Sequence, residues 1–327
     1  MAIASPAPFQ SARSSHSSIR PGLRLLVESK LNDPTILVVY HEPVNNFSCS
    51  CWDEIDDRLR FKDVFKSNVV KAFGTCEHCG VYGKNTSYQA RKFGHIYFIP
   101  LIPMGSKSQI IRECKNCSMG AQIPVEKYEP LADALSDQFK SWITAIGEGE
   151  TETVVNEGEE PVNLGILVAG ILEDLYCLNE VESIDSIEMI LDSNNMNFEK
   201  EIVNGQWWEI KGDLDKAGLN YQAALKQRPR DSAGLFRLGM LELKRKNPDQ
   251  AEAVFKEYLT ESPEDVYPVY IELASAYEGQ KNYPKIVEAY DVLYESNPAL
   301  IAQKPMKKVY RKACKKSKIE GKFLAQL

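Results

Sequence analysis

The sequence predicts an α+β multidomain chain in which a small β domain is followed by an all-α helical solenoid. Three observations carry this expectation. Residues 53–128 contain short apolar segments broken by Gly and Pro, and residues beyond 129 place apolar side chains at helical steps of three and four. A period of 34 residues runs through the last third. The length of 327 residues fits about two domains.

Composition excludes several classes of protein. Apolar residues make up 43% and charged residues 26%, and the net charge of −7 argues against binding nucleic acid or an anionic membrane over the whole surface. The longest uncharged apolar run, residues 161–172, is too short to cross a bilayer. Eight cysteines are too few for a disulfide scaffold. We therefore expect a cytoplasmic protein without a transmembrane segment.

The first 52 residues are expected to form a disordered or irregular segment. Residues 1–30 are rich in Ser, Ala, Pro and Arg, a composition that cannot bury enough apolar surface to fold. The same composition fits an organelle transit peptide, which stays open as the alternative. The apolar run at residues 35–40 predicts at most an isolated strand.

Two C-x-x-C pairs indicate a metal site within residues 53–128. Cys76 and Cys79 form one pair, and Cys114 and Cys117 form the other. Two residues between cysteines allow one tight turn to present both sulfurs to a single ion. Four thiolates match one tetrahedral Zn²⁺, and a closed shell of protein ligands indicates a structural ion. A redox dithiol is the alternative.

The neighbours of the cysteines refine this expectation. Gly80 follows the first pair, where positive φ is often needed, whereas Ser118 takes the matching place in the second turn and specifies its geometry less well. Arg112 and Lys115 are expected to offset the negative charge of the thiolates. His78 lies within the first turn and is interpreted as a surface residue.

Residues 64–124 resemble small zinc-ribbon domains. The resemblance rests on the two cysteine pairs and on the intervening Phe98-Ile-Pro-Leu-Ile-Pro103 stretch. It implies a zinc-bound β-hairpin domain and no established activity. Pro100 and Pro103 argue against a regular central strand at this stretch. Some zinc ribbons bind nucleic acid, and aromatic and basic residues do alternate here: Tyr82, Lys84, Tyr88, Arg91, Lys92 and Phe93.

Residues 129–160 are expected to connect the two domains. Leu135, Phe139 and Trp142 recur at helical steps, so an amphipathic helix comes first. A stretch rich in Gly and Glu follows and predicts a flexible acidic linker. This linker is expected to let the two domains bind one partner together or bridge two partners.

The helical domain, residues 161–327, carries the repeats. Three sets of residues recur: Ala217, Tyr221, Ala224 and Pro229; Ala251, Phe255, Tyr258 and Pro263; Ile286, Tyr290, Leu293 and Pro298. This pattern resembles the tetratricopeptide family. Small residues at Gly205, Gly239 and Ala274 are expected to let paired helices approach, with the aromatics filling the gaps between neighbouring pairs. Residues 163–195 predict a degenerate extra pair, and the basic residues 305–318 predict a capping helix.

The resemblance implies a concave groove that binds a peptide. Nine groove-facing positions follow from the family frame: Ile202, Gln206 and Glu209; Phe236, Met240 and Leu243; Ile271, Ser275 and Glu278. Phe236, Met240 and Leu243 are expected to form the central contact, and a Lys or Arg of the ligand to meet Glu209 or Glu278. The competing interpretation places the apolar residues in the core between repeats. The residues by which some family members clamp a terminal carboxylate are missing.

These features predict a non-catalytic interaction or scaffold protein with a protein or peptide partner. The alternative is a nucleic-acid-associated factor in which the ribbon contacts RNA or DNA and the repeats recruit protein. Enzyme activity is not expected, because the sequence has no phosphate-binding glycine loop, no G-x-S-x-G and no H-E-x-x-H.

Overall fold

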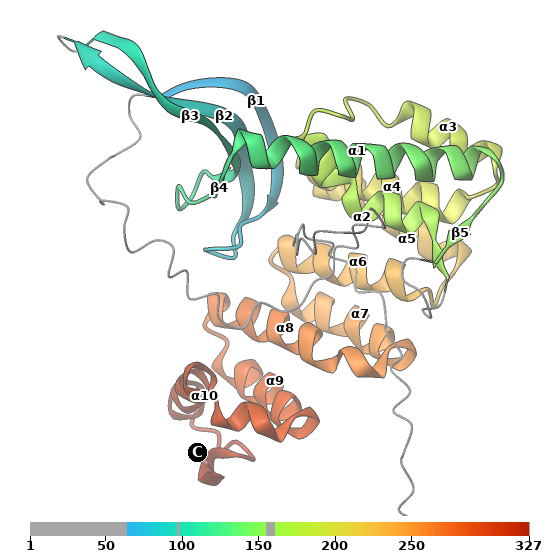
Figure 1. The fold of residues 1–327 in the computed structure, drawn as a ribbon. Coiled ribbons are helices and arrows are strands. Elements are labelled where there is room, and N and C mark those ends of the chain that lie inside the picture. The colour runs from blue at the N-terminus through green and yellow to red at the C-terminus, as the bar shows by residue number, and fades with distance from the viewer. Residues whose placement is uncertain (1–63, 97–98, 155–160, 327) are drawn as a thin grey trace, which may run out of the picture.

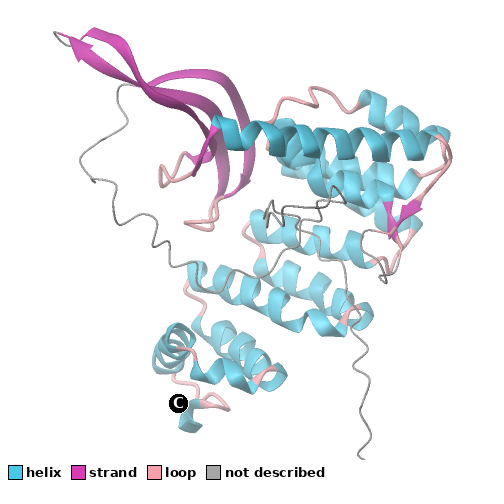
Figure 2. Cartoon of the chain, viewed as in Figure 1, coloured by secondary structure: helices cyan, strands magenta, loops and turns pink. Residues whose placement is uncertain are grey.

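The computed structural model describes residues 64–96, 99–154 and 161–326. The expectations for residues 1–52 lie outside the described residues. The described chain forms a four-stranded antiparallel sheet and then a stack of helices (Figures 1 and 2). This arrangement confirms the α+β fold class.

The sheet is a meander in which sequence neighbours pair. Its strands are β1 (Val64–Thr75), β2 (Tyr82–Ile96), β3 (Ile99–Cys114) and β4 (Ala121–Pro124). Among the residues whose side chains are described, its own buried apolar cluster is small: Tyr88, Ala90 and Ile110. So small a core gives the sheet little hydrophobic stabilisation, and a bound metal or packing against another element has to supply the rest.

Pro100 and Pro103 both lie within β3, but not in a regular central strand. Pro103 pairs with Phe93 and Pro100 with His95 of β2. On its other side β3 pairs with β4 only between Ser108 and Ile111. The prolines therefore occupy a two-stranded part of the sheet, where one edge of β3 is not paired with another strand. Proline is tolerated there because it has no backbone N–H to donate to a neighbouring strand.

The helix expected at the start of the linker belongs to the helical body. Helix α1 (Val125–Gly147) begins directly after β4 and buries Leu135, Trp142 and Ile146 in the core that also holds α2. The chain after α1 is partly fixed, because β5 (Glu152–Thr153) pairs with β6 (Val162–Asn163). The boundary at residue 129 therefore does not coincide with a structural one.

The expected degenerate pair exists as two helices but not as a hairpin. Helix α2 (Leu164–Cys177) packs mainly against α4 (Asn197–Lys211), whereas α3 (Asp185–Ser193) packs against α1 and α4. Asn163 caps α2 by accepting a hydrogen bond from the N–H of Ile166. These helices form a bundle with α1 at the entry to the repeats.

The repeats form three helical hairpins. These are α4 with α5 (Leu214–Gln227), α6 (Ser232–Lys244) with α7 (Pro248–Glu261), and α8 (Val266–Gln280) with α9 (Tyr283–Ser296). Short 3-10 helices, η1 (Pro263–Asp265) and η2 (Pro298–Ala302), follow the second and third hairpins. Both begin at the recurring proline, which cannot continue the preceding helix.

The stack ends in the expected basic helix α10 (Lys304–Ser317), followed by η3 (Leu324–Gln326). The apolar face of α10 is buried against the third hairpin and includes Met306, Tyr310 and Ala313. None of the helices within the described ranges combines the length and the apolar character needed to cross a membrane.

The sheet docks onto the first helices. β1 packs against α2 and α4. The hydroxyl of Tyr82 donates a 2.6 Å hydrogen bond to the carbonyl of Glu209 near the end of α4. The ring of Phe73 lies against Gly212, the left-handed residue that ends this helix, so closely that a β-carbon there would be 2.7 Å from the ring. The ribbon and the helices are therefore packed together, contrary to the expectation of a flexible connection.

Candidate metal centre and repeat face

The meander brings both C-x-x-C turns to one end of the sheet. The first turn, residues 76–81, joins β1 to β2, and the second, residues 115–120, joins β3 to β4. In an antiparallel meander, alternate connections lie at the same end. The two cysteine pairs therefore meet, although 34 residues separate them in sequence.

The two turns have matching backbone geometry. The N–H of Gly80 donates to the carbonyl of Cys76 and the N–H of Ser118 to that of Cys114, both at 2.8 Å. Gly80 has φ of 66° and Ser118 has φ of 58°. The second turn is therefore as well defined as the first, and Ser118 adopts a left-handed conformation that glycine would adopt more easily.

The four sulfur atoms form a compact cluster with the dimensions of a tetrahedral thiolate site. All four lie within 4.8 Å of one another. The Cys76–Cys117 and Cys79–Cys114 sulfur pairs are 3.6 and 3.9 Å apart. An ion with metal–sulfur bonds of about 2.3 Å requires sulfurs about 3.8 Å apart. The geometry and the all-sulfur donor set therefore fit a tetrahedral metal such as zinc.

The surroundings of the four cysteines shift the pKa values of Cys76 and Cys79 in opposite directions. Burial raises the pKa of the Cys76 thiol to about 12, whereas hydrogen bonds from the Asn116 side chain and the Val81 backbone lower the pKa of Cys79 to about 6. The Asn116 amide lies 3.5 Å from the Cys79 sulfur and so links the second turn to the first. Cys79 can therefore offer a thiolate at neutral pH, and the charge of a bound cation favours deprotonation of the others.

The expected charge compensation by Arg112 is wrong. Its guanidinium points to α2, with Nη2 2.7 Å from the Asp174 carboxylate and Nε 3.3 Å from that of Glu173. This pair joins the sheet to the helices. Lys115 and His78 are exposed beside the turns, and the sulfur cluster is complete without the histidine.

Two aromatics proposed to stack on bases are already used within the chain. Tyr88 is 4% exposed, and the ammonium of Lys66 lies 3.8 Å from the centre of its ring. Tyr82 is held against α4 by its bond to Glu209. The ammonium of Lys244 lies 5.7 Å from the centre of the Tyr82 ring. Each of these two rings therefore already contacts a lysine of this chain.

The first-copy groove positions are not open. Ile202 is fully buried in the core shared with α2. Glu209 is 3% exposed, accepts a 2.9 Å hydrogen bond from the Tyr221 hydroxyl and pairs with Lys244. Gln206 accepts a hydrogen bond from Arg237. Because α2 and β1 pack against α4, the expectation that Ile202 and Glu209 face a ligand is wrong.

The second and third copies differ from the first. Met240, Leu243 and Ile271 are half-buried at the margin of the second apolar core, and Ser275 is exposed. Phe236 is also half-buried, but its ring packs against Tyr258 with centroids 5.3 Å apart. Phe236 therefore contributes substantially to the hairpin core, as the competing interpretation expects.

The glutamate expected to bind a ligand cation in the third copy also has a partner. Glu278 lies 3.4 Å from the ammonium of Lys312 on α10, and both side chains are about half exposed. Glu209 and Lys244 form the corresponding pair two repeats earlier. A cationic ligand would have to displace a lysine at either position, so the predicted ligand cation finds no unpaired glutamate there.

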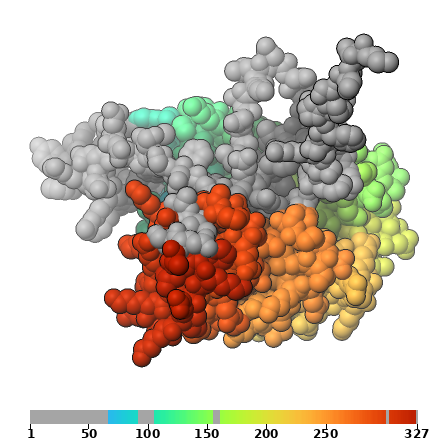
Figure 3. All heavy atoms as spheres, turned by 90° about the horizontal axis from the view of Figure 1, so that it is seen from below, coloured from blue at the N-terminus to red at the C-terminus, as the bar shows by residue number. Residues whose placement is uncertain are grey.

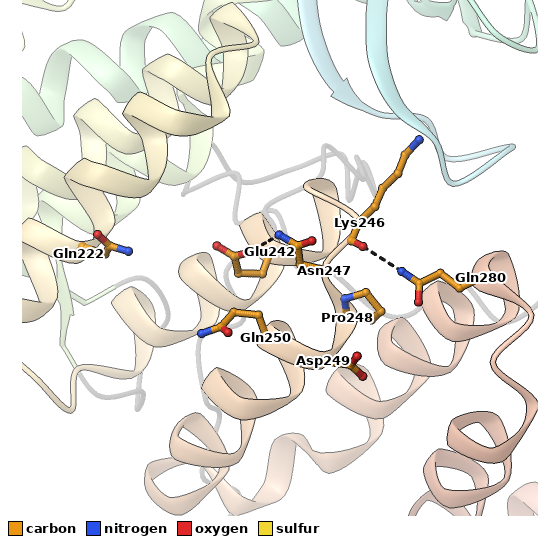
Figure 4. A pocket seen from close by; sticks show the side chains of 8 residues that line it. All are labelled: Gln222, Glu242, Lys246, Asn247, Pro248, Asp249, Gln250 and Gln280. Carbon is orange, nitrogen blue, oxygen red and sulfur yellow. Dashed lines mark hydrogen bonds between the residues drawn. The ribbon is translucent and has the colours of Figure 1, made fainter.

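An open polar pocket of about 590 Å³ lies on another part of the repeats (Figure 4). Its lining comes from α5, the α6–α7 turn and the end of α8: Gln222, Glu242, Lys246, Asn247, Pro248, Asp249, Gln250 and Gln280. Glu242 replaces the usual aromatic, and its buried carboxylate binds Arg245 at 2.7 Å and Asn247 at 3.1 Å. The lining offers no nucleophile with a neighbouring base. Sequence reasoning missed this pocket because its residues follow no motif.

Comparison with known proteins identifies the central hairpins. The family model described as tetratricopeptide repeat matches residues 211–266, which span α5, α6 and α7. A search of the curated proteins found no matching relative. The chain therefore contains a tetratricopeptide repeat, joined to a four-cysteine cluster on a small antiparallel sheet consistent with a zinc ribbon.

Proposed function

We propose that this chain is a non-catalytic scaffold that holds a peptide segment of another protein on the first helices of its second and third hairpins. Tetratricopeptide repeats imply protein–protein interaction. The observation that carries the proposal is that Met240, Leu243 and Ile271 keep part of their apolar surface exposed at positions that the family frame assigns to the groove, where Ser275 is exposed as well. Partly exposed apolar side chains on a rigid helix can serve as anchors for a peptide.

The charges near this face favour an apolar ligand. Glu278 is paired with Lys312, so the face carries no unpaired acidic group at that position. Affinity then has to come from apolar side chains of the partner, with polar contacts at the rim, as in most interfaces. An uncharged or amphipathic peptide fits this face better than a basic one.

We propose zinc as the metal and a structural purpose for it. Four protein sulfurs close a tetrahedral shell, leaving no position for a substrate or an activated water. When bound, the ion would supply a cross-link between the two hairpin turns of a sheet whose own core is small. The thiols must stay reduced to bind it, which supports a reducing compartment such as the cytoplasm.

Two alternatives have less support. An enzyme would need a nucleophile, a base or an open metal position, and neither the polar pocket nor the closed sulfur cluster offers one. A nucleic-acid-binding ribbon would need aromatic faces for the bases, and the rings of Tyr82 and Tyr88 already contact Lys244 and Lys66. Protein binding therefore remains the better-supported function.

The test places a large side chain at the centre of the proposed face. Ser275→Arg changes an exposed residue of α8, and Ala253→Arg makes the equivalent change on α7, away from the face. Partners captured by the full chain are purified, and their affinity is measured by calorimetry. We expect Ser275→Arg to weaken binding by at least about tenfold and Ala253→Arg by less than about twofold. Normal affinity of the Ser275→Arg variant would contradict the proposal.

A further inference from the structure

Opposite charges gather at opposite ends of the molecule. Residues 129–199 contain seventeen acidic residues and one basic, and residues 304–322 contain nine basic residues and one acidic. Helix α1 lies at one end of the structure and α10 at the other, with the hairpins between them (Figure 1). α1 packs against α2, α3, β3 and β4, whereas α10 packs against α9, η2 and η3. The two helices therefore cannot neutralise each other within one chain.

The exposed face of α10 carries a row of lysines. Lys304, Lys308 and Lys315 are all exposed, and their spacing of four and seven residues places them on one side of the helix. None of the three forms an ion pair with a residue in the described ranges. The opposite side of the helix is buried against the third hairpin. Figure 3 shows this C-terminal region at one end of the stack, with the middle helices between it and the entry bundle.

The exposed face of α1 carries a row of acids of the same length. Glu126, Glu129, Asp133 and Asp137 are all exposed and follow steps of three and four residues. The first and last residues of each row are eleven positions apart, which is about 16 Å along a helix. One charge of the acidic row has a neighbour, since Asp137 lies 3.7 Å from Lys140, but both side chains are largely exposed. Such a pair is weak and leaves the row strongly negative.

We propose that the lysine row of α10 binds the acidic row of α1 in a second copy of this chain. The rows match in length and helical spacing and are opposite in charge, and every copy carries both. Because two different surfaces meet, one contact leaves an acidic row free on one molecule and a basic row free on the other. These free rows let association continue head to tail, and it closes only where both pairs of rows meet within one ring or dimer. This inference is independent of the peptide-binding face.

The contact is weak and depends on salt. Exposed ion pairs contribute little individually and are screened by ions. Association is therefore expected at about 0.01 M ionic strength, where the Debye length is about 30 Å, and is largely lost at about 0.15 M, where it is about 8 Å. In cells such a contact would act between copies brought together by a shared partner.

The test uses sedimentation velocity of the zinc-loaded full chain at both ionic strengths. The α10 variant is Lys304→Glu with Lys308→Glu and Lys315→Glu. A control of equal net charge, Lys71→Glu with Lys107→Glu and Lys226→Glu, changes three exposed lysines outside both rows. We expect the sedimentation coefficient of the wild type and the control to rise with concentration at low salt. The α10 variant is expected to need at least about tenfold higher concentration.

A second variant tests the identity of the occupant. Glu129→Lys with Asp133→Lys and Asp137→Lys makes α1 basic, so alone it is expected to stay monomeric. Mixed with the α10 variant it is expected to associate, because each basic row then meets an acidic one. A monomeric wild type at low salt, equal association of the α10 variant and the control, or no association of the mixture would overturn the proposal. A monomeric wild type would leave the lysine row for an acidic partner of another kind.

Discussion

The ring of Tyr221 lies against the backbone of Gly205, in the space that the β-carbon of any other residue would occupy. Phe255 and Gly239 repeat this relationship one hairpin later. Both aromatic rings are fully buried. The aromatics therefore set the distance between the two helices of one hairpin, whereas the sequence suggested that they fill the gap between neighbouring hairpins.

Gly239→Ala should destabilise the chain despite the higher helix propensity of alanine. The new methyl group overlaps the Phe255 ring, and such overpacking costs about 1–3 kcal/mol. Gly279→Ala is the control, because a β-carbon there meets nothing within 4 Å and should be neutral or stabilise α8 by about 0.5–1 kcal/mol. Urea denaturation measures both, and an equal effect of the two substitutions would show that the hairpin tolerates a wider spacing.

Glu252 should make stability depend on pH in the acid range. Burial acts to raise its pKa, but hydrogen bonds from Lys256, Tyr277 and Lys285 outweigh burial and lower the pKa to about 2. A lowered carboxyl pKa stabilises the fold above the unfolded-state value of about 4.3, and the effect is lost as the pH falls towards 2. Glu252→Gln should therefore cost about 2–3 kcal/mol at pH 7 and progressively less below pH 4.

The control for this prediction is Glu288→Gln, which removes a carboxylate that is 62% exposed and binds the same Lys285. Exposed pairs contribute about 0–1 kcal/mol, so its effect should be small at every pH. The free energies of unfolding of the wild type, Glu252→Gln and Glu288→Gln are measured from denaturation curves between pH 7 and about pH 3. A wild-type advantage over Glu252→Gln that stays constant with pH would contradict the assignment.

The two cysteine turns should respond in opposite ways to exchange of their left-handed residues. Ser118 has φ of 58°, so Ser118→Gly should relieve strain and improve metal binding by about 0.5–1 kcal/mol. A β-carbon on Gly80 meets nothing within 4 Å, so Gly80→Ala should cost about 1 kcal/mol through its backbone alone. Competition with a chromophoric chelator measures the affinity, with Ser118→Ala as the neutral control. Tighter binding by Gly80→Ala would refute the strain argument.

Removal of the metal should destabilise α2 and α4, which contact the sheet, and should leave α9 and α10 unaffected. Phe73 and Tyr82 contact the end of α4, and Arg112 pairs with α2, so unfolding of the ribbon exposes both helices. After chelation, hydrogen exchange should rise in α2 and in the last turns of α4, with α9 and α10 unchanged. Unchanged exchange in α4 would mean that the helices do not depend on the ribbon.

Local patterns made much of the fold predictable. The cysteine spacing specifies a turn, and two such turns in one small domain predict a shared site, so the clustering of Cys76, Cys79, Cys114 and Cys117 could be predicted from the sequence. The repeat period could be read because each hairpin needs a small residue opposite an aromatic one. These signals lie within single elements or between neighbouring ones.

Long-range contacts were not predictable in the same way. Arg112 next to a cysteine turn reads as charge compensation, and only the folded chain shows its partners on α2. Glu209 fits the repeat frame as a ligand contact, but docking of the sheet and α2 buries it with Lys244 and Tyr221. These contacts join elements that are distant in sequence, and they are formed by common residue types. No sequence motif therefore predicts them.

Hydrogen exchange of the full chain with and without a purified partner tests the central claim most directly. If the repeats hold a peptide on their first helices, protection should concentrate in α6 and α8, around Met240 and Ser275. Protection confined to the outer helices α5, α7 and α9, or to the sheet, would contradict the claim that this face is where the chain binds its partner.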